Sequence, residues 1–237
     1  MILKILVMSV SFITKENVKD IIKTKKSNIC LAADVETVNE LYSVIEELGE
    51  YICILKIHYD IISDFHDNLE KTIMDLNKYK KKYNFLIWED RKFADIGMVM
   101  ARQVKNHISR WADIVSVHSI AGLESVKTLD FISIFLIAEL SSKGNLTDSN
   151  YIIRSTIISE ELDNVIGIVC QHKIKCGKLM VVPGISLKKS EDGMGQQHDC
   201  IDSPSKKFAD IFVIGRGILQ SGNPKKTIQD LIAKISI

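Results

Sequence analysis

The chain contains eight short apolar runs that recur along its 237 residues, and this recurrence limits the folds that it can adopt. The runs are rich in β-branched residues and are almost continuous in apolar character. Such runs are typical of parallel strands that are covered on both faces. They are Ile29–Ala33, Ile52–Leu55, Phe85–Trp88, Ile114–Val117, Ile132–Ala138, Val165–Cys170, Leu179–Val182 and Ile211–Ile214.

Stretches of helical length separate most of these runs. Val35–Leu48 has apolar residues at the spacing of an amphipathic helix, and Leu69–Tyr79 and Gly97–His107 also predict helices. Between the sixth and seventh runs, Gln171–Lys178 leaves room for only a short helix. Eight strands that alternate with helices predict an α/β fold, a (β/α)8 TIM barrel, and an open doubly wound sheet is the alternative.

The chain shows no linker, internal repeat or low-complexity segment. We therefore expect residues 1–237 to form a single barrel domain, with residues 1–27 as an N-terminal extension or helix that packs on the barrel. One long irregular stretch, Gly184–Ser205, follows the seventh run. Irregular stretches of this length within a compact domain are commonly functional, so we expect a lid over the site.

The overall charge balance excludes several classes of partner. The formal net charge is +1, from 31 basic and 30 acidic residues, so we expect neither nucleic-acid nor membrane binding.

Five scattered cysteines without a CxxC spacing predict reduced thiols rather than disulfides or zinc ligands. The apolar Met1–Met8 segment lacks the basic start and cleavage site of a signal peptide. These features predict a cytoplasmic protein.

The segment Asp90–Gly97 has an unusual concentration of charge. With Glu89 before it, five charged side chains fall within seven residues, directly after a run that predicts a buried strand. Each unpaired ion beside a core costs several kcal/mol, so charged side chains rarely gather at the end of a buried strand unless a ligand binds there. The Asp90, Lys92 and Asp95 spacing therefore indicates an active site, and a solvated turn with a local ion pair is the alternative.

Polar side chains also follow the other predicted strands. In barrels of this kind, catalysis takes place where the loops after the strands converge. Taken singly, His118 could be a core histidine, Asp34 a helix N-cap and Ser141 a turn residue. The candidates at strand ends are Asp34, Lys56, His58, Asp90, Lys92, His118, Ser141 and Arg216.

The last two predicted strands are followed by glycine-containing segments. Pro183-Gly184 follows the seventh strand, and Gly215-Arg216-Gly217 follows the eighth. Barrel enzymes often bind phosphate at these two loops, where glycines allow close approach of the backbone and an arginine offers a bidentate contact. We therefore expect a small-molecule substrate that carries a phosphate.

The motifs together resemble orotidine 5'-phosphate decarboxylase, in the form found as the C-terminal half of eukaryotic UMP synthase. The resemblance begins at about residue 28, runs to the end of the chain in family order, and is most specific at Asp90–Gly97. The other matching segments are Leu31–Val35, Leu55–His58, Ala138–Ser142, Pro183–Gly184, Gly195–Gln197 and Gly215–Ile218.

The resemblance implies decarboxylation of orotidine 5'-phosphate to UMP and CO2 without a cofactor or metal. Lys92 would stabilise carbanion-like charge at C6 and donate the proton, and Asp90 would lie near the departing carboxylate and keep Lys92 charged. Lys56 would complete the charge network and, with Asp34, contact the ribose. Asp95 would reach into the partner's site, which implies a homodimer with shared active sites.

The resemblance also assigns residues to substrate binding. Ser141 and Gln196 would contact the pyrimidine, and Gln196, Gly215 and Arg216 would hold the phosphate. The full set is Asp34, Lys56, His58, Lys92, Asp95, Ile96, Ser141, Pro183, Gln196, Gln197, His198, Gly215 and Arg216.

The sequence departs from the family pattern at several positions. Met98 and Val99 replace a usual Asn-Thr pair, and Ile57, Ser116 and His198 replace a usual threonine, asparagine and tyrosine. None of these changes touches the Asp-Lys-Asp charges. Two alternatives stay open: a non-catalytic UMP-binding derivative, and a metal-dependent sugar-phosphate decarboxylase or aldolase of the same superfamily.

Overall fold

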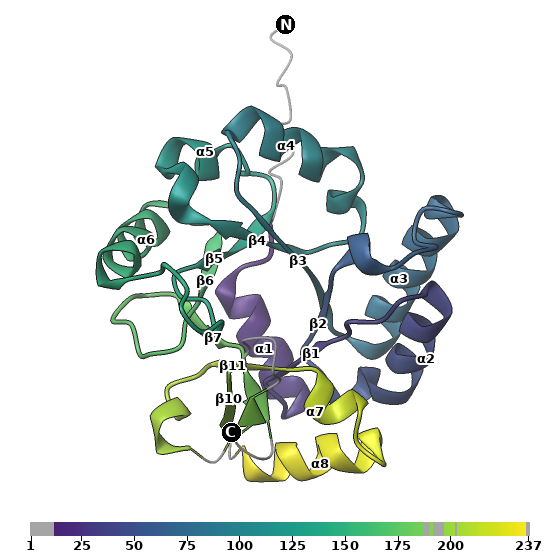
Figure 1. The fold of residues 1–237 in the computed structure, drawn as a ribbon. Coiled ribbons are helices and arrows are strands. Elements are labelled where there is room, and N and C mark those ends of the chain that lie inside the picture. Colours follow the sequence, from purple (N-terminus) through teal and green to yellow (C-terminus); the bar gives the residue numbers. More distant parts are fainter. Residues whose placement is uncertain (1–11, 187–189, 192–196, 202, 236–237) are drawn as a thin grey trace, which may run out of the picture.

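Eight parallel strands close into a barrel in a computed structural model that describes residues 12–186, 190–191, 197–201 and 203–235 (Figure 1). The last strand, β11, pairs with both β7 and β1 and thereby closes the sheet. The TIM barrel prediction is confirmed, and the open doubly wound sheet is excluded. The strands are β1 (Ile29–Ala32), β2 (Ile54–Ile57), β3 (Leu86–Phe93), β4 (Ile114–His118), β5 (Ser133–Ile137), β6 (Val165–Val169), β7 (Leu179–Val182) and β11 (Ile211–Ile214).

Helices surround the barrel, and short 3-10 turns follow several of its elements (Figure 1). The α-helices are α1 (Lys15–Lys25), α2 (Val38–Leu48), α3 (Leu69–Tyr83), α4 (Gly97–Asn106), α5 (Leu123–Lys127), α6 (Ser149–Glu161), α7 (Arg216–Leu219) and α8 (Pro224–Lys234). The 3-10 turns are η1 (Gly49–Tyr51), η2 (Tyr59–Ile61), η3 (Ile108–Arg110), η4 (Ser119–Ala121) and η5 (Pro204–Lys206).

The strands bury both of their faces, which explains their continuous apolar character. Alternate residues point into the barrel or outward to the helices, so Cys30 belongs to the interior cluster and Leu31 to the outer one. Inside the barrel, Trp88 and Phe135 meet edge to face with their ring centroids 5.0 Å apart. Gly167 makes room for Phe135, because a Cβ atom there would lie 2.8 Å from the phenyl ring.

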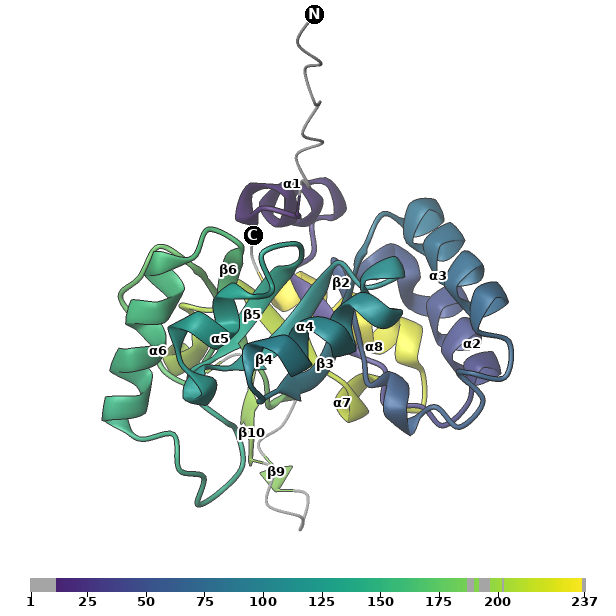
Figure 2. The same cartoon turned by 90° about the horizontal axis from the view of Figure 1, so that it is seen from above.

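Helix α1 covers one end of the barrel, and β9 and β10 lie toward the opposite end (Figure 2). Val18 and Ile22 of α1 are buried among the interior side chains of the strands. The side chain of Lys15 donates a hydrogen bond of 2.8 Å to the carbonyl of Gly177. The helix therefore seals the barrel at the end opposite to the predicted site.

The observed elements differ from the sequence-based expectations at three points that bear on the site. Strand β3 continues to Phe93 instead of ending at Trp88, so much of the charged segment lies within the strand. Helix α2 begins at Val38 with Thr37 as its N-cap, so Asp34 is not the cap. Residues 171–178, all of which are described, contain no helix. A β6–β7 connection without a helix departs from regular barrel alternation.

The stretch after β7 forms a small three-stranded sheet from β8 (Ile185–Ser186), β9 (Ser190–Glu191) and β10 (Gln197–Cys200). Residues 187–189, 192–196 and 202 lie outside the described residues, so the predicted lid stays a prediction. None of the helices in the described part of the chain has both the length and the apolar character needed to cross a bilayer.

Candidate active site

A cavity of about 350 Å³ opens at the C-terminal ends of the barrel strands. Nine residues singled out from the sequence line it together, although they come from six different strand ends. These nine are Asp34, Lys56, His58, Asp90, Lys92, Ser141, Pro183, Gly215 and Arg216. Convergence of the strand ends therefore brings together side chains that lie far apart in the sequence.

Positive and negative side chains alternate along one side of this cavity. The ammonium of Lys56 lies 3.2 Å from Asp34 and 3.3 Å from Asp90. The ammonium of Lys92 lies 2.8 Å from the same Asp90 carboxylate. Asp90 therefore lies between two lysines, and each buried charge has an opposite partner, which offsets much of the cost of removing it from water.

This alternation fixes the charge states of the network. Burial disfavours a charged carboxylate, but Lys56, Lys92 and His58 outweigh it and hold the pKa of Asp90 below its usual value. Burial likewise favours a neutral amine, but Asp90 and Asp34 raise the pKa of Lys56 above its usual value. Burial, reinforced by the charge of Lys56, lowers the pKa of His58 to about 4. At neutral pH the site therefore has charged Asp90 and Lys56 beside a neutral imidazole.

An irregularity in β3 shapes the position of Lys92. The pairing of β3 with β4 changes register between Glu89 and Phe93, and Lys92 has a left-handed backbone with φ of 57°. A non-glycine residue in this conformation is strained and is commonly found at functional sites. The backbone N–H of Lys92 donates to Ser116 Oγ at 3.0 Å, which compensates part of that strain.

Ser116 is a site residue whose role the sequence reasoning missed. Its hydroxyl donates to Asp90 Oδ1 at 2.8 Å while it accepts the N–H of Lys92. The side chain is fully buried on β4. A lone polar residue within the apolar run of a predicted strand was the available signal, because a buried hydroxyl must find a partner.

The opposite wall comes from the ends of β5, β7 and β11. Glu139, Leu140 and Ser141 follow β5, and Pro183 and Gly184 follow β7. Gly184 has φ of 76°, which favours glycine. A Cβ atom on Gly215 would lie 2.9 Å from the carbonyl oxygen of Ala32, so only glycine lets the β11 and β1 ends approach this closely.

Among the described residues, Asp95, Ile96 and His118 do not line this cavity. Asp95 and Ile96 are exposed at the start of α4, and Asp95 Oδ1 accepts the N–H of Ile96 at 2.7 Å. His118 is turned toward α6, with its Nδ1 3.3 Å from the hydroxyl of Tyr151. Gln196 lies outside the described residues, and only the backbone of Gln197 and His198 is described, on β10.

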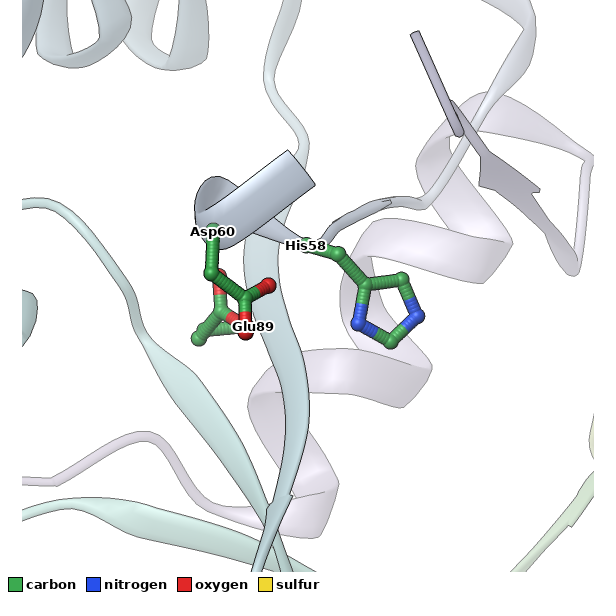
Figure 3. A group of neighbouring side chains, drawn as sticks. All are labelled: His58, Asp60 and Glu89. Carbon is green, nitrogen blue, oxygen red and sulfur yellow. The ribbon is translucent and has the colours of Figure 1, made fainter. Parts of the chain in front are cut away.

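Beside the cavity, His58, Asp60 and Glu89 form a compact group whose ligand-type atoms lie within 4.8 Å of one another (Figure 3). Figure 3 shows the carboxyl groups of Asp60 and Glu89 close together, with the ring of His58 to one side. Burial raises the pKa of Glu89 to about 8, and the charge of Asp60 adds to the effect. A proton on Glu89 therefore relieves the repulsion between the carboxyl groups without a cation.

The barrel and the charged cavity at its C-terminal end define an enzyme of the TIM barrel class. A profile of the Orotidine 5'-phosphate decarboxylase / HUMPS family matches residues 27–231. The chain belongs to this family. It is 38% identical to orotidine 5'-phosphate decarboxylase of Cyberlindnera fabianii in an alignment 220 residues long, which covers 85% of this chain and 82% of that relative. It is 37% identical to the same enzyme of Pachysolen tannophilus over 221 residues, with 86% and 82% coverage.

Solved structures share the fold at lower sequence identity. Orotidine 5'-phosphate decarboxylase from Pyrococcus horikoshii OT3 superposes with a TM-score of 0.69 at 22% identity, covering 87% of this chain and 98% of that one. The Methanocaldococcus jannaschii orotidine 5'-monophosphate decarboxylase, complexed with the inhibitor BMP, gives a TM-score of 0.65 at 20% identity, with 89% and 99% coverage. At these identities the likeness establishes the fold.

Proposed function

We propose that this protein decarboxylates orotidine 5'-phosphate to UMP and CO2, a step of pyrimidine biosynthesis. The observation that carries the proposal is the alternating network of Asp34, Lys56, Asp90 and Lys92 in the cavity of a chain that belongs to the decarboxylase family. A cation beside the reacting carbon lowers the energy of the negative charge that develops there.

In this proposal Lys92 carries the chemistry. As the bond from C6 to the carboxylate breaks, its electron pair stays on C6 and CO2 leaves. The ammonium of Lys92 stabilises this charge and then donates a proton to C6, which yields UMP. Asp90, 2.8 Å from the ammonium, pairs with Lys92 and orients it.

Asp90 would also lie near the substrate carboxylate. Two like charges about 4 Å apart repel by roughly 4 kcal/mol at an effective dielectric near 20. Departure of CO2 relieves that repulsion. Because Lys56 and Lys92 both pair with Asp90, the network already offsets part of its charge, so we assign Asp90 chiefly to holding Lys92.

The remaining cavity residues would bind the rest of the substrate. Asp34 and Lys56 would contact the ribose, and Ser141 the pyrimidine. Gly215 and Arg216 would hold the phosphate, with Gln196 and its neighbours Gln197 and His198 contributing from the stretch after β7. His58 and Pro183 would complete the wall. Binding at the remote phosphate can then be used to order the reacting end.

We propose a homodimer with shared active sites. Asp95 and Ile96 are exposed just before α4, and the apolar side chains of Ile96 and Met98 are 61% and 57% exposed. Exposed apolar side chains of this kind favour burial against another protein surface. Asp95 would then enter the partner's cavity. We further propose that the dimer is cytoplasmic and binds neither nucleic acid nor membranes.

A turnover assay tests the activity directly. Purified protein is mixed with orotidine 5'-phosphate, and the absorbance change of decarboxylation is followed with and without EDTA. Turnover that EDTA does not affect supports the proposal. Loss of turnover in EDTA would favour a metal-dependent enzyme, for which His58, Asp60 and Glu89 offer ligand atoms. UMP binding without turnover would favour the non-catalytic derivative.

A further inference from the structure

The connection that leaves β6 lies between two opposite charges. The carboxylate of Glu139, at the end of β5, accepts the backbone N–H groups of Gln171 and His172 at 2.8 and 2.9 Å. On the other side, the ammonium of Lys206 donates to the carbonyl of Gln171 at 2.7 Å. The peptide group that joins residues 171 and 172 is therefore aligned between a carboxylate and an ammonium ion.

The side chain of Gln171 extends this arrangement to β7. Its Nε2 donates to the carbonyl of Pro183 at 3.1 Å, and its Oε1 lies 3.3 Å from the ammonium of Lys206. Lys206 and Glu139 are buried, with 4% and 7% of their surface exposed. Hydrogen bonds to charged groups are worth more than neutral ones, and buried charges held by several such bonds are well fixed in position.

We propose that Gln171, held between Glu139 and Lys206, is a positioning residue that fixes Pro183 and Gly184 in the wall of the substrate cavity. Pro183 and Gly184 line the cavity, whereas Gln171 and Lys206 do not. This inference rests on the proposed decarboxylase activity for its kinetic consequence. Its structural part is independent of that activity.

The chemistry of Pro183 and Gly184 explains why the wall needs support from Gln171, Glu139 and Lys206, which together form a brace. Proline lacks an N–H group and glycine lacks a side chain, so Pro183 and Gly184 have few means of fixing themselves. The β6–β7 connection also contains no helix in residues 171–178 that could pack behind them. The carbonyl of Pro183 is the group that Gln171 holds. Removing the Gln171 amide therefore frees the backbone on which the wall depends.

Hydrogen exchange of the free protein tests the structural part. Gln171→Met keeps the side-chain length but removes both polar atoms, and Lys206→Met removes the ammonium. We expect both variants to speed exchange in a peptide covering residues 179–186 by about fivefold. Lys178→Met is the matched control, because Lys178 lies in the same connection but donates to the carbonyl of Leu162 at the end of α6, away from the cavity. Unchanged exchange in both variants, or an equal change in the control, would contradict the brace.

Steady-state kinetics tests the consequence. We expect Gln171→Met to raise KM for orotidine 5'-phosphate about fivefold while kcat changes less than about twofold, because a wall residue is displaced and Lys92 is not. Lys206→Arg should keep KM near the wild-type value, because a guanidinium can also donate to the Gln171 carbonyl. If Lys206→Met does not fold, Gln171→Met decides alone.

The two kinds of failure are distinguishable. An unchanged KM in Gln171→Met, or a fall in kcat alone, would overturn the positioning role. A wild-type protein without turnover would contradict the proposed function instead, and the exchange experiment would still decide whether the brace holds the wall.

Discussion

The ammonium of Lys92 lies 2.8 Å from the carboxylate of Asp90, two residues earlier on the same strand. The two side chains meet where β3 loses its regular pairing with β4 and Lys92 takes a left-handed backbone. Ser116, from the neighbouring strand, holds both residues through a single hydroxyl. The central pair of the site thus depends on a local distortion that another strand stabilises.

Replacing Lys92 with alanine should abolish turnover while UMP binding is largely kept. The ammonium is the proposed proton donor, and its loss removes stabilisation that exists only when charge develops at C6. We expect kcat to fall by about 10³-fold or more. Calorimetry with UMP serves as the control for folding and binding. Turnover within about tenfold of the wild type would exclude Lys92 as the donor.

Ser116→Ala should lower kcat about tenfold, because one lost hydrogen bond to a charged group costs roughly 1.5–3 kcal/mol, part of it in orienting Asp90. The matched control is Ser133→Ala on β5. That hydroxyl is equally buried but donates to the carbonyl of Ile13, away from the cavity. Equal kinetic effects from the two variants would mean that Ser116 does not act through Asp90 and Lys92.

Shared active sites predict complementation between two inactive variants. Lys92→Ala and Asp95→Ala damage residues that, in the proposed dimer, serve different sites of the pair. Co-expression should therefore give mixed dimers with one intact site, and about a quarter of wild-type activity in the whole preparation. Co-expression of Lys92→Ala with the double variant K92A/D95A is the control, because no intact site forms. Activity no higher than in this control would contradict shared sites.

Glu89→Gln should make the protein more stable, and the gain should grow as pH rises. The pKa of Glu89 is about 8 in the folded protein and about 4.3 in an unfolded chain, so the folded state holds a proton that the unfolded state has lost between these values. Stability therefore falls across this window, and glutamine removes the loss. Thermal unfolding should show a gain on the order of 10 °C at pH 8 and of about 2–4 °C at pH 5. An equal gain in melting temperature at pH 5 and pH 8 would contradict this pH dependence.

Gly167→Ala tests the packing of the barrel interior. The added methyl group would lie 2.8 Å from the ring of Phe135, which itself packs on Trp88. We expect a loss of about 1–3 kcal/mol in the free energy of unfolding, measured by denaturant titration. Gly177→Ala is the control, because its nearest neighbours would be the Glu160 carboxylate oxygens at 3.7 Å. Comparable losses in both variants would indicate a backbone effect instead.

The sequence determined the barrel because the pattern that encodes it is local. Each short apolar run carries its own signal for a strand covered on both faces, and the helices between the runs show their own periodicity. The last strand, Ile211–Ile214, was predicted to the residue. Polar residues at strand ends also have a local signal, so Asp34, Lys56, Asp90 and Arg216 could be named as site residues before the structure.

Tertiary structure decided what those residues touch. Strand β3 continues through Asp90 and Lys92 with a register shift against β4. No pattern in the sequence reports such a shift, because it arises from the pairing of two strands. Ser116 and Gln171 became significant only when the pairing of neighbouring strands brought them to Asp90 and Pro183. Hydrogen bonds and ion pairs depend on distances of a few ångströms, which only the closed barrel fixes.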